Sequence, residues 1–397
     1  MIYINCVVYA QHHTEPDSTA NHHHEENLFS HEDHHDHMSA ENQGFHFGAF
    51  AEINYLQPID KEKIYNGHLN VERMVFIANY TFNKRTWFVS EIELEKVKDI
   101  FIEQAYVNHQ ILPWLNFRAG LMLIPFGYIN ENHEPTIYNG VLRPNVDTYI
   151  VPTPWREIGM GFAGKFAHTG IKYQLYVVNG FKSYENEALL DGASGLVGGR
   201  QMGAESYISS PNYSGKIEYV GIPGLRIGLS GYFGDTQSNL YHGIARDDEA
   251  AIARADSSVV GVNMGGIDVR YRTGKWFMRA EYIVADLNGT NEYNLFTQNN
   301  LGSRITGYFA EVSREVCLQS EHCQAFIPFV RFEYFDTHAD VPDCITTNEA
   351  FQRMEILTGF GWKLHPNAIL KADYQFTKIA NEHHWHHHLN IGVGISF

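Results

Sequence analysis

The chain of 397 residues contains no long hydrophobic run. A helix that spans a membrane needs about 18 or more consecutive apolar residues, so the sequence excludes helical spans. Basic residues are also few: 29 Lys and Arg stand against 46 Asp and Glu, which gives a formal net charge of −17. Because nucleic-acid binding depends on basic side chains that neutralise phosphates, this balance argues against a nucleic-acid partner.

Cysteine is scarce, with four residues in the whole chain. No Cys-x-x-Cys spacing is present, which argues against a zinc site built from thiolates. Cys317 and Cys323 have five residues between them within one predicted turn, so they are the candidate disulfide in an oxidising compartment. Cys344 stays unpaired or competes for one of them, and Cys6 lies in a signal-like N-terminal stretch.

Catalytic and nucleotide-binding motifs are also lacking. The chain has no P-loop and no G-x-S-x-G nucleophile motif. With 23 His in the chain, chance combinations of Ser and His carry no information about a catalytic triad. We therefore do not expect an enzyme.

The residues that are present favour β-structure. Aromatic residues make up 14% of the chain, with 23 Tyr and 25 Phe. From Leu389 to Phe397, apolar residues occupy every second position, and small or polar residues fill the positions between. A period of two is typical of a β-strand with one apolar face. The same alternation recurs in segments such as 275–286 and 369–377, with charged residues on one face and aromatic residues on the other.

About sixteen strands are predicted between residues 44 and 397, and short and long connections alternate between them. The predicted fold is an all-β, transmembrane, antiparallel up-and-down β-barrel. The strands are expected to start near residues 45, 67, 86, 99, 114, 156, 170, 212, 224, 262, 275, 303, 325, 351, 367 and 386. The long connections include 125–155, 182–211, 235–261 and 287–302.

The last strand, with its terminal Phe397, resembles the closing strand of bacterial outer-membrane β-barrels. This resemblance implies the outer membrane of a Gram-negative bacterium, with lipid around the barrel. Short turns and the N-terminal tail would lie in the periplasm, and the long loops would lie outside the cell.

The N-terminal region divides into two expected segments. Residues 1–10 are interpreted as a signal-peptide remnant, because Val8 and Ala10 occupy the small-residue positions of a cleavage site, although the basic start is missing. An ordinary disordered N-terminus is the alternative. Residues 11–43 contain nine His and eight Asp or Glu with no Lys or Arg, which predicts a disordered periplasmic tail.

Two stretches resemble one known family. The segments EQAYVNHQILPWLNFRAGLMLIPFG and VLRPNVDTYIVPTPWREIGMGFAG are similar to the porin O/P-like, phosphate-selective porin-like outer-membrane porins of the Bacteroidetes type. The resemblance is strongest over residues 99–165. It implies a sixteen-stranded trimeric barrel whose third long loop, 125–155, folds inward and narrows the pore.

The predicted function is a passive, water-filled channel for small hydrophilic solutes or ions. Alternation assigns nine inward-facing basic and nine inward-facing acidic residues, and this balance favours weak ion selectivity. An anion- or phosphate-selective channel and a non-conducting, metal-binding barrel are the alternatives. The inward set is Arg118, Lys172, Lys216, Arg226, Arg270, Arg272, Arg279, Arg331, Lys371, Glu72, Glu91, Glu93, Glu95, Glu218, Asp268, Glu281, Glu333 and Asp373.

Loop 125–155 and the strand after it add further charges to the candidate constriction. Arg143, Asp147, Arg156 and Glu157 are expected near the narrowest point of the pore. The alternative interpretation is that these residues only pin the loop to the wall through ion pairs.

Histidine tracts form candidate metal sites for loosely bound Zn, Ni or Cu. Flexible tracts of this kind fix no coordination geometry, so no resident cofactor is required. We expect the tail to carry most of the metal affinity. The candidate ligands are His22, His23, His24, His31, His34, His35 and His37 in the tail, and His383, His384, His386, His387 and His388 near the C-terminus.

Overall fold

The computed structural model describes residues 43–319 and 324–397. The predicted signal remnant, almost all of the predicted tail and Cys323 lie outside these residues. The described strands of the main sheet are β1 (Gly44–Ile59), β2 (His68–Asn83), β3 (Thr86–Glu95), β4 (Asp99–Leu112), β5 (Leu115–Leu123), β6 (Arg156–Phe166), β7 (Ile171–Val178), β9 (Asn212–Ile222), β10 (Leu225–Asp235), β12 (Gly261–Thr273), β13 (Trp276–Asn288), β14 (Arg304–Arg314), β15 (Val316–Gln319), β16 (Gln324–Asp340), β17 (Gln352–His365), β18 (Ala368–Ile379) and β19 (Trp385–Ser396).

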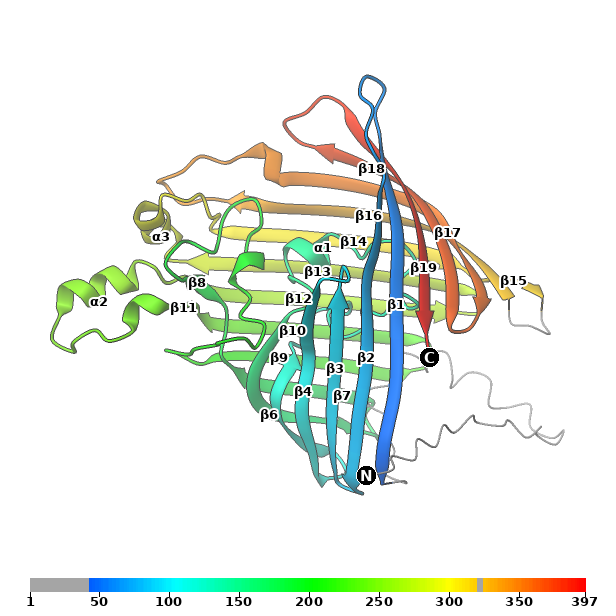
Figure 1. Cartoon of the computed structure of the whole chain (residues 1–397), viewed down its shortest axis with the longest axis horizontal. Helices are drawn as coiled ribbons and strands as arrows, with labels where there is room; N and C mark the ends of the chain where they lie inside the picture. The colour runs from blue at the N-terminus through cyan, green and yellow to red at the C-terminus, as the bar shows by residue number, and fades with distance from the viewer. Residues whose placement is uncertain (1–42, 320–323) are drawn as a thin grey trace, which may run out of the picture.

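These strands form one closed antiparallel barrel with sixteen strand positions, in which β14 and β15 share a position because both pair with β16. Closure occurs between β1 and β19, where Ala49 and Phe397 exchange two backbone hydrogen bonds of 2.8 Å. Closure pairs both edges of the main sheet among the described strands, which lipid around a barrel requires. Figure 1 shows the strands curving around an interior that contains a short helix. The predicted fold class is confirmed, and every predicted strand start lies within one residue of the observed start.

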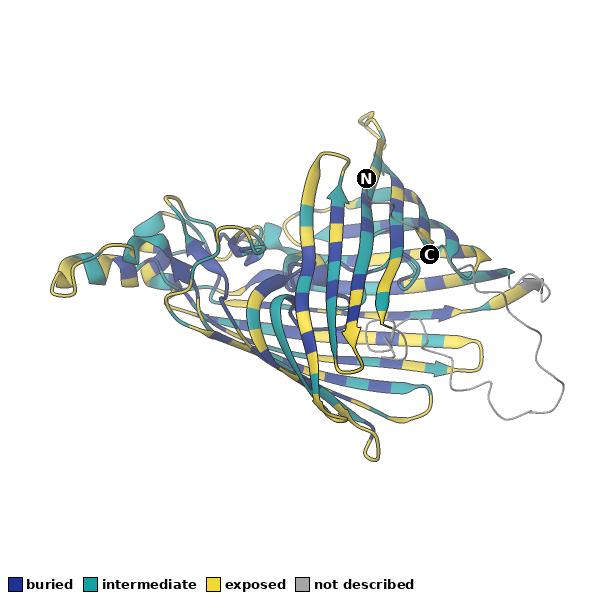
Figure 2. Ribbon diagram, turned by 60° about the horizontal axis from the view of Figure 1, so that its bottom comes forward, coloured by how far each residue is buried: buried dark blue, intermediate teal, exposed yellow. Residues whose placement is uncertain are grey.

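The two faces of each strand differ in chemistry, as β13 illustrates. Its outward side chains Met278 and Tyr282 are 42% and 47% exposed, whereas the inward Arg279 and Glu281 are each 3% exposed. Figure 2 shows the resulting bands of buried and exposed residues along the strands. Because the exposed band is apolar, the barrel presents a lipid-compatible outer surface. Among the described residues, no helix is long and apolar enough to cross a membrane.

Connections alternate between short turns at one end of the barrel and longer loops at the other. The turns include 84–85, 113–114, 223–224 and 274–275, as the sequence predicts. The loops at the opposite end are named L1 (60–67), L2 (96–98), L3 (124–155), L4 (179–211), L5 (236–260), L6 (289–303), L7 (341–351) and L8 (380–384).

Small elements stiffen these loops. A two-stranded parallel sheet of β8 and β11 ties L4 to L5. The loop elements are α1 (Val146–Tyr149) in L3, β8 (Lys182–Tyr184) and η1 (Val197–Gly199) in L4, β11 (Gln237–Ser238), η2 (Asn239–Tyr241) and α2 (Glu249–Asp256) in L5, α3 (Thr290–Thr297) in L6, and η3 (Glu349–Phe351) in L7.

An apolar cluster joins L3 and L4 to the inner face of the wall. Trp155 is fully buried and packs its ring 4.7 Å from Phe181 of L4 and 4.6 Å from Tyr232 of β10. Phe126 and Ile150 of L3 belong to the same buried cluster. L3 and L4 are therefore held by burial of apolar surface as well as by polar contacts.

Candidate functional site

L3 is bonded to the wall formed by β16 to β18. The backbone N–H of Val141 donates to Asp373 and that of Asn145 donates to Glu333, each over 2.6 Å. Lys371 donates to the carbonyl oxygens of Tyr138 and Gly140 at 2.6 and 2.9 Å. Because each wall charge contacts loop backbone, this side of the barrel holds L3 in one position.

The first part of L3 contacts a second part of the wall, from β9 to β13, which β14 separates from the first part. Lys216 donates to the carbonyl of Gly127, and the Arg270 guanidinium lies 4.2 Å above the centre of the Tyr128 ring. Gly127 has a φ of +66°, and a Cβ there would lie 2.1 Å from a carboxylate oxygen of Glu281. Only glycine permits this approach. L3 therefore spans the interior between two groups of strands.

The inward wall beneath L3 carries two neighbouring rows of like charge, set by the strand register. The basic row contains Arg226 of β10, Arg270 of β12, Arg279 of β13 and Arg331 of β16, with Glu311 of β14 between the last two. The acidic row contains Asp268 of β12, Glu281 of β13, Glu333 of β16 and Glu355 of β17, with Phe309 of β14 within it. On β12, β13 and β16, which carry both rows, the acidic residue lies two residues closer to the long loops than the basic one.

Like charges that face one another across strands repel, so this arrangement needs compensation. Ion pairs between the rows and within the basic row supply it. Arg331 lies 2.6 Å from Glu333, and Arg279 lies 2.5 Å from Glu311. Arg270 lies 3.3 Å from Asp268 and also contacts Glu218. The wall charges are thus largely neutralised in pairs.

The structure places most of the predicted pore-lining residues under L3 and not against open solvent. L3 covers part of this inward wall, for example through the bonds of Lys371 and Asp373 to its backbone. The buried residues are Asp147, Arg156, Glu157, Arg226, Arg270, Arg279, Glu281, Arg331, Glu333, Lys371 and Asp373. Arg118, Arg143 and Arg272 keep intermediate exposure.

Asp147 lies at the centre of L3, in α1, and is fully buried. Burial, followed by the nearby charge of Glu333, raises the pKa of Asp147 to about 8. The side chain is therefore mostly protonated at neutral pH and adds little negative charge to the candidate constriction. Arg143, four residues earlier in the loop, retains partial exposure.

Glu157 serves as an anchor for the two long loops. Its carboxylate accepts hydrogen bonds from Trp155 Nε1 at 2.8 Å, from the backbone N–H of Gly180 at 2.7 Å and from the Tyr232 hydroxyl at 3.1 Å. These donors belong to L3, L4 and β10. These contacts of Glu157 are hydrogen bonds from neutral donors and not the ion pairs of the alternative interpretation.

Three arginines gather where L3 meets L4. Arg156 is buried, and none of its three guanidinium nitrogens has a hydrogen-bond partner among the described residues. Burial, followed by the charges of Arg156 and Arg143, lowers the pKa of Arg200 to about 10. Arg200 also donates to the carbonyl of Pro152 at 3.0 Å, which ties L4 to L3. This group is called the arginine group (Arg143, Arg156 and Arg200).

Several inward charges escaped the sequence analysis. Arg73 and Glu52 form a buried pair 3.2 Å apart, and the Tyr138 hydroxyl of L3 donates to the same glutamate at 2.9 Å. Glu103 pairs with His133 of L3 at 2.9 Å. Register shifts at Glu52/Ile53 in the β1–β2 pair and at Glu91/Ile92 in the β3–β4 pair break the alternation there. A strict period of two therefore assigns Glu72 but misses its neighbour Arg73.

The remaining predicted sites fall in three places. Among the C-terminal histidines, His384 and His386 meet Glu382, whereas His387 packs its ring against Tyr374 and Phe376. The tail histidines lie outside the described residues. Cys317 is an exposed free thiol and its predicted partner lies outside the described residues, so the disulfide stays a prediction.

Comparisons with known proteins show the same architecture. The anion-selective porin from Comamonas acidovorans has a TM-score of 0.56 at 9% identity, with 90% of this chain and 100% of that chain covered. Salmonella typhi OmpF in complex with daunomycin has a TM-score of 0.56 at 8% identity, with 89% and 98% covered. The outer-membrane channel DcaP of Acinetobacter baumannii has a TM-score of 0.55 at 10% identity, with 89% and 97% covered. The chain has the fold of an outer-membrane porin.

The apolar outer band and this fold place the chain in the outer membrane of a Gram-negative bacterium. A protein of Aquifex aeolicus (strain VF5), described as uncharacterised, is 28% identical over 344 residues, which cover 84% of this chain and 75% of that protein. No family model matches the chain. The more specific porin O/P-like resemblance stays a prediction.

Proposed function

We propose that this chain is a passive outer-membrane porin that lets small hydrophilic solutes or ions diffuse through a pore narrowed by L3. It acts as a channel and not as an enzyme, and it assembles as a homotrimer, as the porin O/P-like resemblance implies. The observation that carries the proposal is the inward loop: L3 bonds to Asp373 and Glu333 on one side and to Lys216 on the other. A loop held at both ends inside a barrel sets a fixed aperture.

The wall charges favour a channel with weak selectivity between cations and anions. The basic and acidic rows lie two residues apart and pair with one another, for example Arg331 with Glu333. Neighbouring rows of opposite sign create a field across the lumen but little net charge. Both cations and anions would therefore pass.

The arginine group favours a second candidate, an anion-selective channel. Three guanidinium groups lie near one another, and Arg156 has hydrogen-bonding capacity that no described residue uses. Arginine binds carboxylate and phosphate oxygens through paired N–H donors. An anion passing L3 would be attracted to this group.

Planar-bilayer recordings of the purified, β-rich protein distinguish these candidates. A passive, weakly selective porin gives water-filled pores whose reversal potential in a KCl gradient stays close to zero. A strongly anionic reversal potential, together with block of chloride current by phosphate, would favour the second candidate. Replacement of Arg156 by Gln should then relieve the block, whereas Arg314→Gln on the outer face should not.

A non-conducting barrel is the third candidate, and the buried cluster around Trp155 favours it, because side chains fill part of the interior. Well-folded protein without conductance would support this candidate against both channels.

A further inference from the structure

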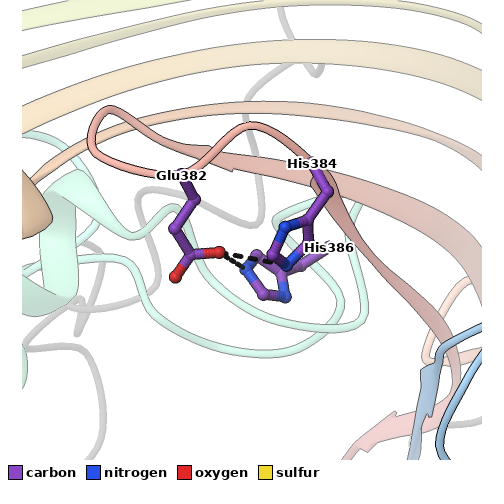
Figure 3. Close-up of side chains that lie close together, drawn as sticks. All are labelled: Glu382, His384 and His386. Carbon is purple, nitrogen blue, oxygen red and sulfur yellow. Dashed lines mark hydrogen bonds and ion pairs between the residues drawn. The ribbon is translucent and has the colours of Figure 1, made fainter.

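The β18–β19 hairpin brings three metal-binding side chains together at the long-loop end of the barrel. Glu382, His384 and His386 converge there (Figure 3). Glu382 Oε2 lies 3.1 Å from His384 Nε2 and 2.5 Å from His386 Nε2. One potential ligand atom from each residue lies within 4.8 Å of the other two.

His384 is the last residue of L8 and His386 lies at the start of β19, and both rings lie beside the Glu382 carboxylate (Figure 3). His387, the next residue along β19, faces the other side of the strand. His387 instead packs against outward rings, 5.3 Å from Phe376. The turn fixes the backbone of Glu382, because its N–H donates to the Ile379 carbonyl at 3.1 Å and its carbonyl accepts from Lys378.

The separation of the donor atoms matches a metal site. Ligands about 2.0–2.1 Å from a tetrahedral ion lie about 3.3 Å from one another. The 3.1 Å pair is close to this value, and the 2.5 Å pair would open when an ion enters.

A second carboxylate adds negative charge nearby. The pairing of Ile59 with His387 brings L1 next to L8. Asp60 of L1 accepts hydrogen bonds from the backbone N–H groups of Glu62 and Lys63 at 2.7 and 2.8 Å. These two hydrogen bonds are the main reason that the pKa of Asp60 is lowered, and the nearby charge of His384 is a smaller cause. An ionised Asp60 favours a cation at this rim.

We propose that Glu382, His384 and His386 form a binding site for a divalent transition metal ion at the rim of the barrel. Two imidazoles and one carboxylate suit Zn²⁺, Ni²⁺ and Cu²⁺, and Cu²⁺ binds such donors most tightly. His384 is 65% exposed in its side chain, so solvent reaches the site and water completes the coordination. The site belongs to the barrel and needs no residue of the N-terminal tail.

Trp385 provides a local reporter, because it lies between the two histidine ligands and is exposed. The full-length protein in detergent is titrated with CuCl₂ while tryptophan fluorescence is recorded. The same titration of Trp385→Phe gives the background from the other tryptophans. The difference between the two curves reports copper at L8 alone, and the tail is unchanged in both.

We expect saturable quenching of the Trp385 signal. His384→Ala and His386→Ala should each raise the copper concentration at half-quenching by at least about tenfold, since loss of a ligand costs at least as much as loss of a supporting partner. Glu382→Gln should act in the same direction. His383→Ala, which removes an exposed neighbour outside the group, should leave the midpoint unchanged.

Circular dichroism checks that each variant keeps its β-structure. An unchanged midpoint in both His384→Ala and His386→Ala would overturn the proposal. Equal weakening by His383→Ala would also overturn it, because copper would then bind loosely to any exposed histidine of the loop. Neither outcome depends on conductance, so failure here leaves the porin proposal untouched.

Discussion

The wall beneath L3 and the wall at β5 and β7 carry inward charges of the same kind in two different environments. Under L3, the Arg331 and Glu333 side chains are 1% and 0% exposed and form a 2.6 Å ion pair. At β5 and β7, Arg118 and Lys172 are only partly buried. The difference teaches that strand alternation decides which side a charge faces, whereas the long loop decides whether that charge meets water.

The two environments give the charges different roles. A buried charge loses hydration, so it needs a partner, and removal of one partner leaves the other uncompensated. A partly exposed charge keeps hydration and acts on passing ions through its field. We therefore assign loop anchoring to the wall under L3 and ion preference to the wall at β5 and β7.

Loss of a buried ion-pair partner under L3 should have the largest effect on the free energy of unfolding. Arg331→Ala leaves the buried Glu333 without its guanidinium partner and removes one of the two arginines beside Glu311, so the free energy of unfolding should fall by about 3–5 kcal/mol. Arg304→Ala removes a pair with Asp286 whose two side chains are 52% and 50% exposed, and it should cost less than about 1 kcal/mol.

Chemical denaturation of both variants in the same detergent measures this contrast. Equal losses of stability in the two variants would remove the distinction between the covered wall and an exposed ion pair.

Titration of Asp147 should have the next largest effect on the stability of the folded chain. Its pKa is raised from 3.8 to about 8, so the folded state favours the protonated form. This stabilisation is complete below the unfolded pKa and is lost as pH rises through about 8. The native chain should therefore lose stability between about pH 4 and about pH 8 relative to Asp147→Asn, which stays neutral, and the two profiles should run parallel above about pH 8.

Denaturation midpoints at several pH values test this effect, with Asp343→Asn, an exposed loop carboxylate, as the control. Identical pH profiles for the native chain and Asp147→Asn would mean that Asp147 is not held in a buried, protonated state.

A change in the more open wall should have the smallest effect on stability and a measurable effect on selectivity. Arg118 donates hydrogen bonds to Asn108, Gln174 and Tyr176 and keeps intermediate exposure. Arg118→Ala should therefore shift the reversal potential in a KCl gradient towards cations with little loss of stability. Arg314→Ala, which packs over the outward Trp276, is the matched control. Equal reversal potentials for both variants would show that Arg118 does not face the ion path.

The sequence is sufficient to predict the fold because lipid and water impose opposite demands on alternate residues. Met278 and Arg279 could not exchange faces without placing a charge in lipid, so periodicity fixes the strands within one residue. The prediction fails locally where a bulge adds a residue, as beside Glu52, and Arg73 is therefore missed. Bulges leave no reliable signal in a single sequence.

From the sequence, the extent to which an inward side chain is buried is harder to predict than the face of the strand on which it lies. Lys371 was correctly placed on the inner face, yet its bonds to Tyr138 and Gly140 of L3 depend on where a loop more than 200 residues earlier comes to rest. For Glu382 and His386, strand alternation could have indicated that neighbouring histidines share a face, but the turn that brings the carboxylate to them is a tertiary feature.

Single-channel conductance tests the central claim most directly, namely that L3 narrows a water-filled pore. The native chain in planar bilayers should conduct steadily. The double replacement Arg143→Ala/Asp147→Ala in L3 should change the single-channel conductance or the ion selectivity, because both residues lie within the loop that spans the interior. Absence of conductance in protein with intact β-structure, or identical channels from the native and doubly substituted chains, would contradict the account.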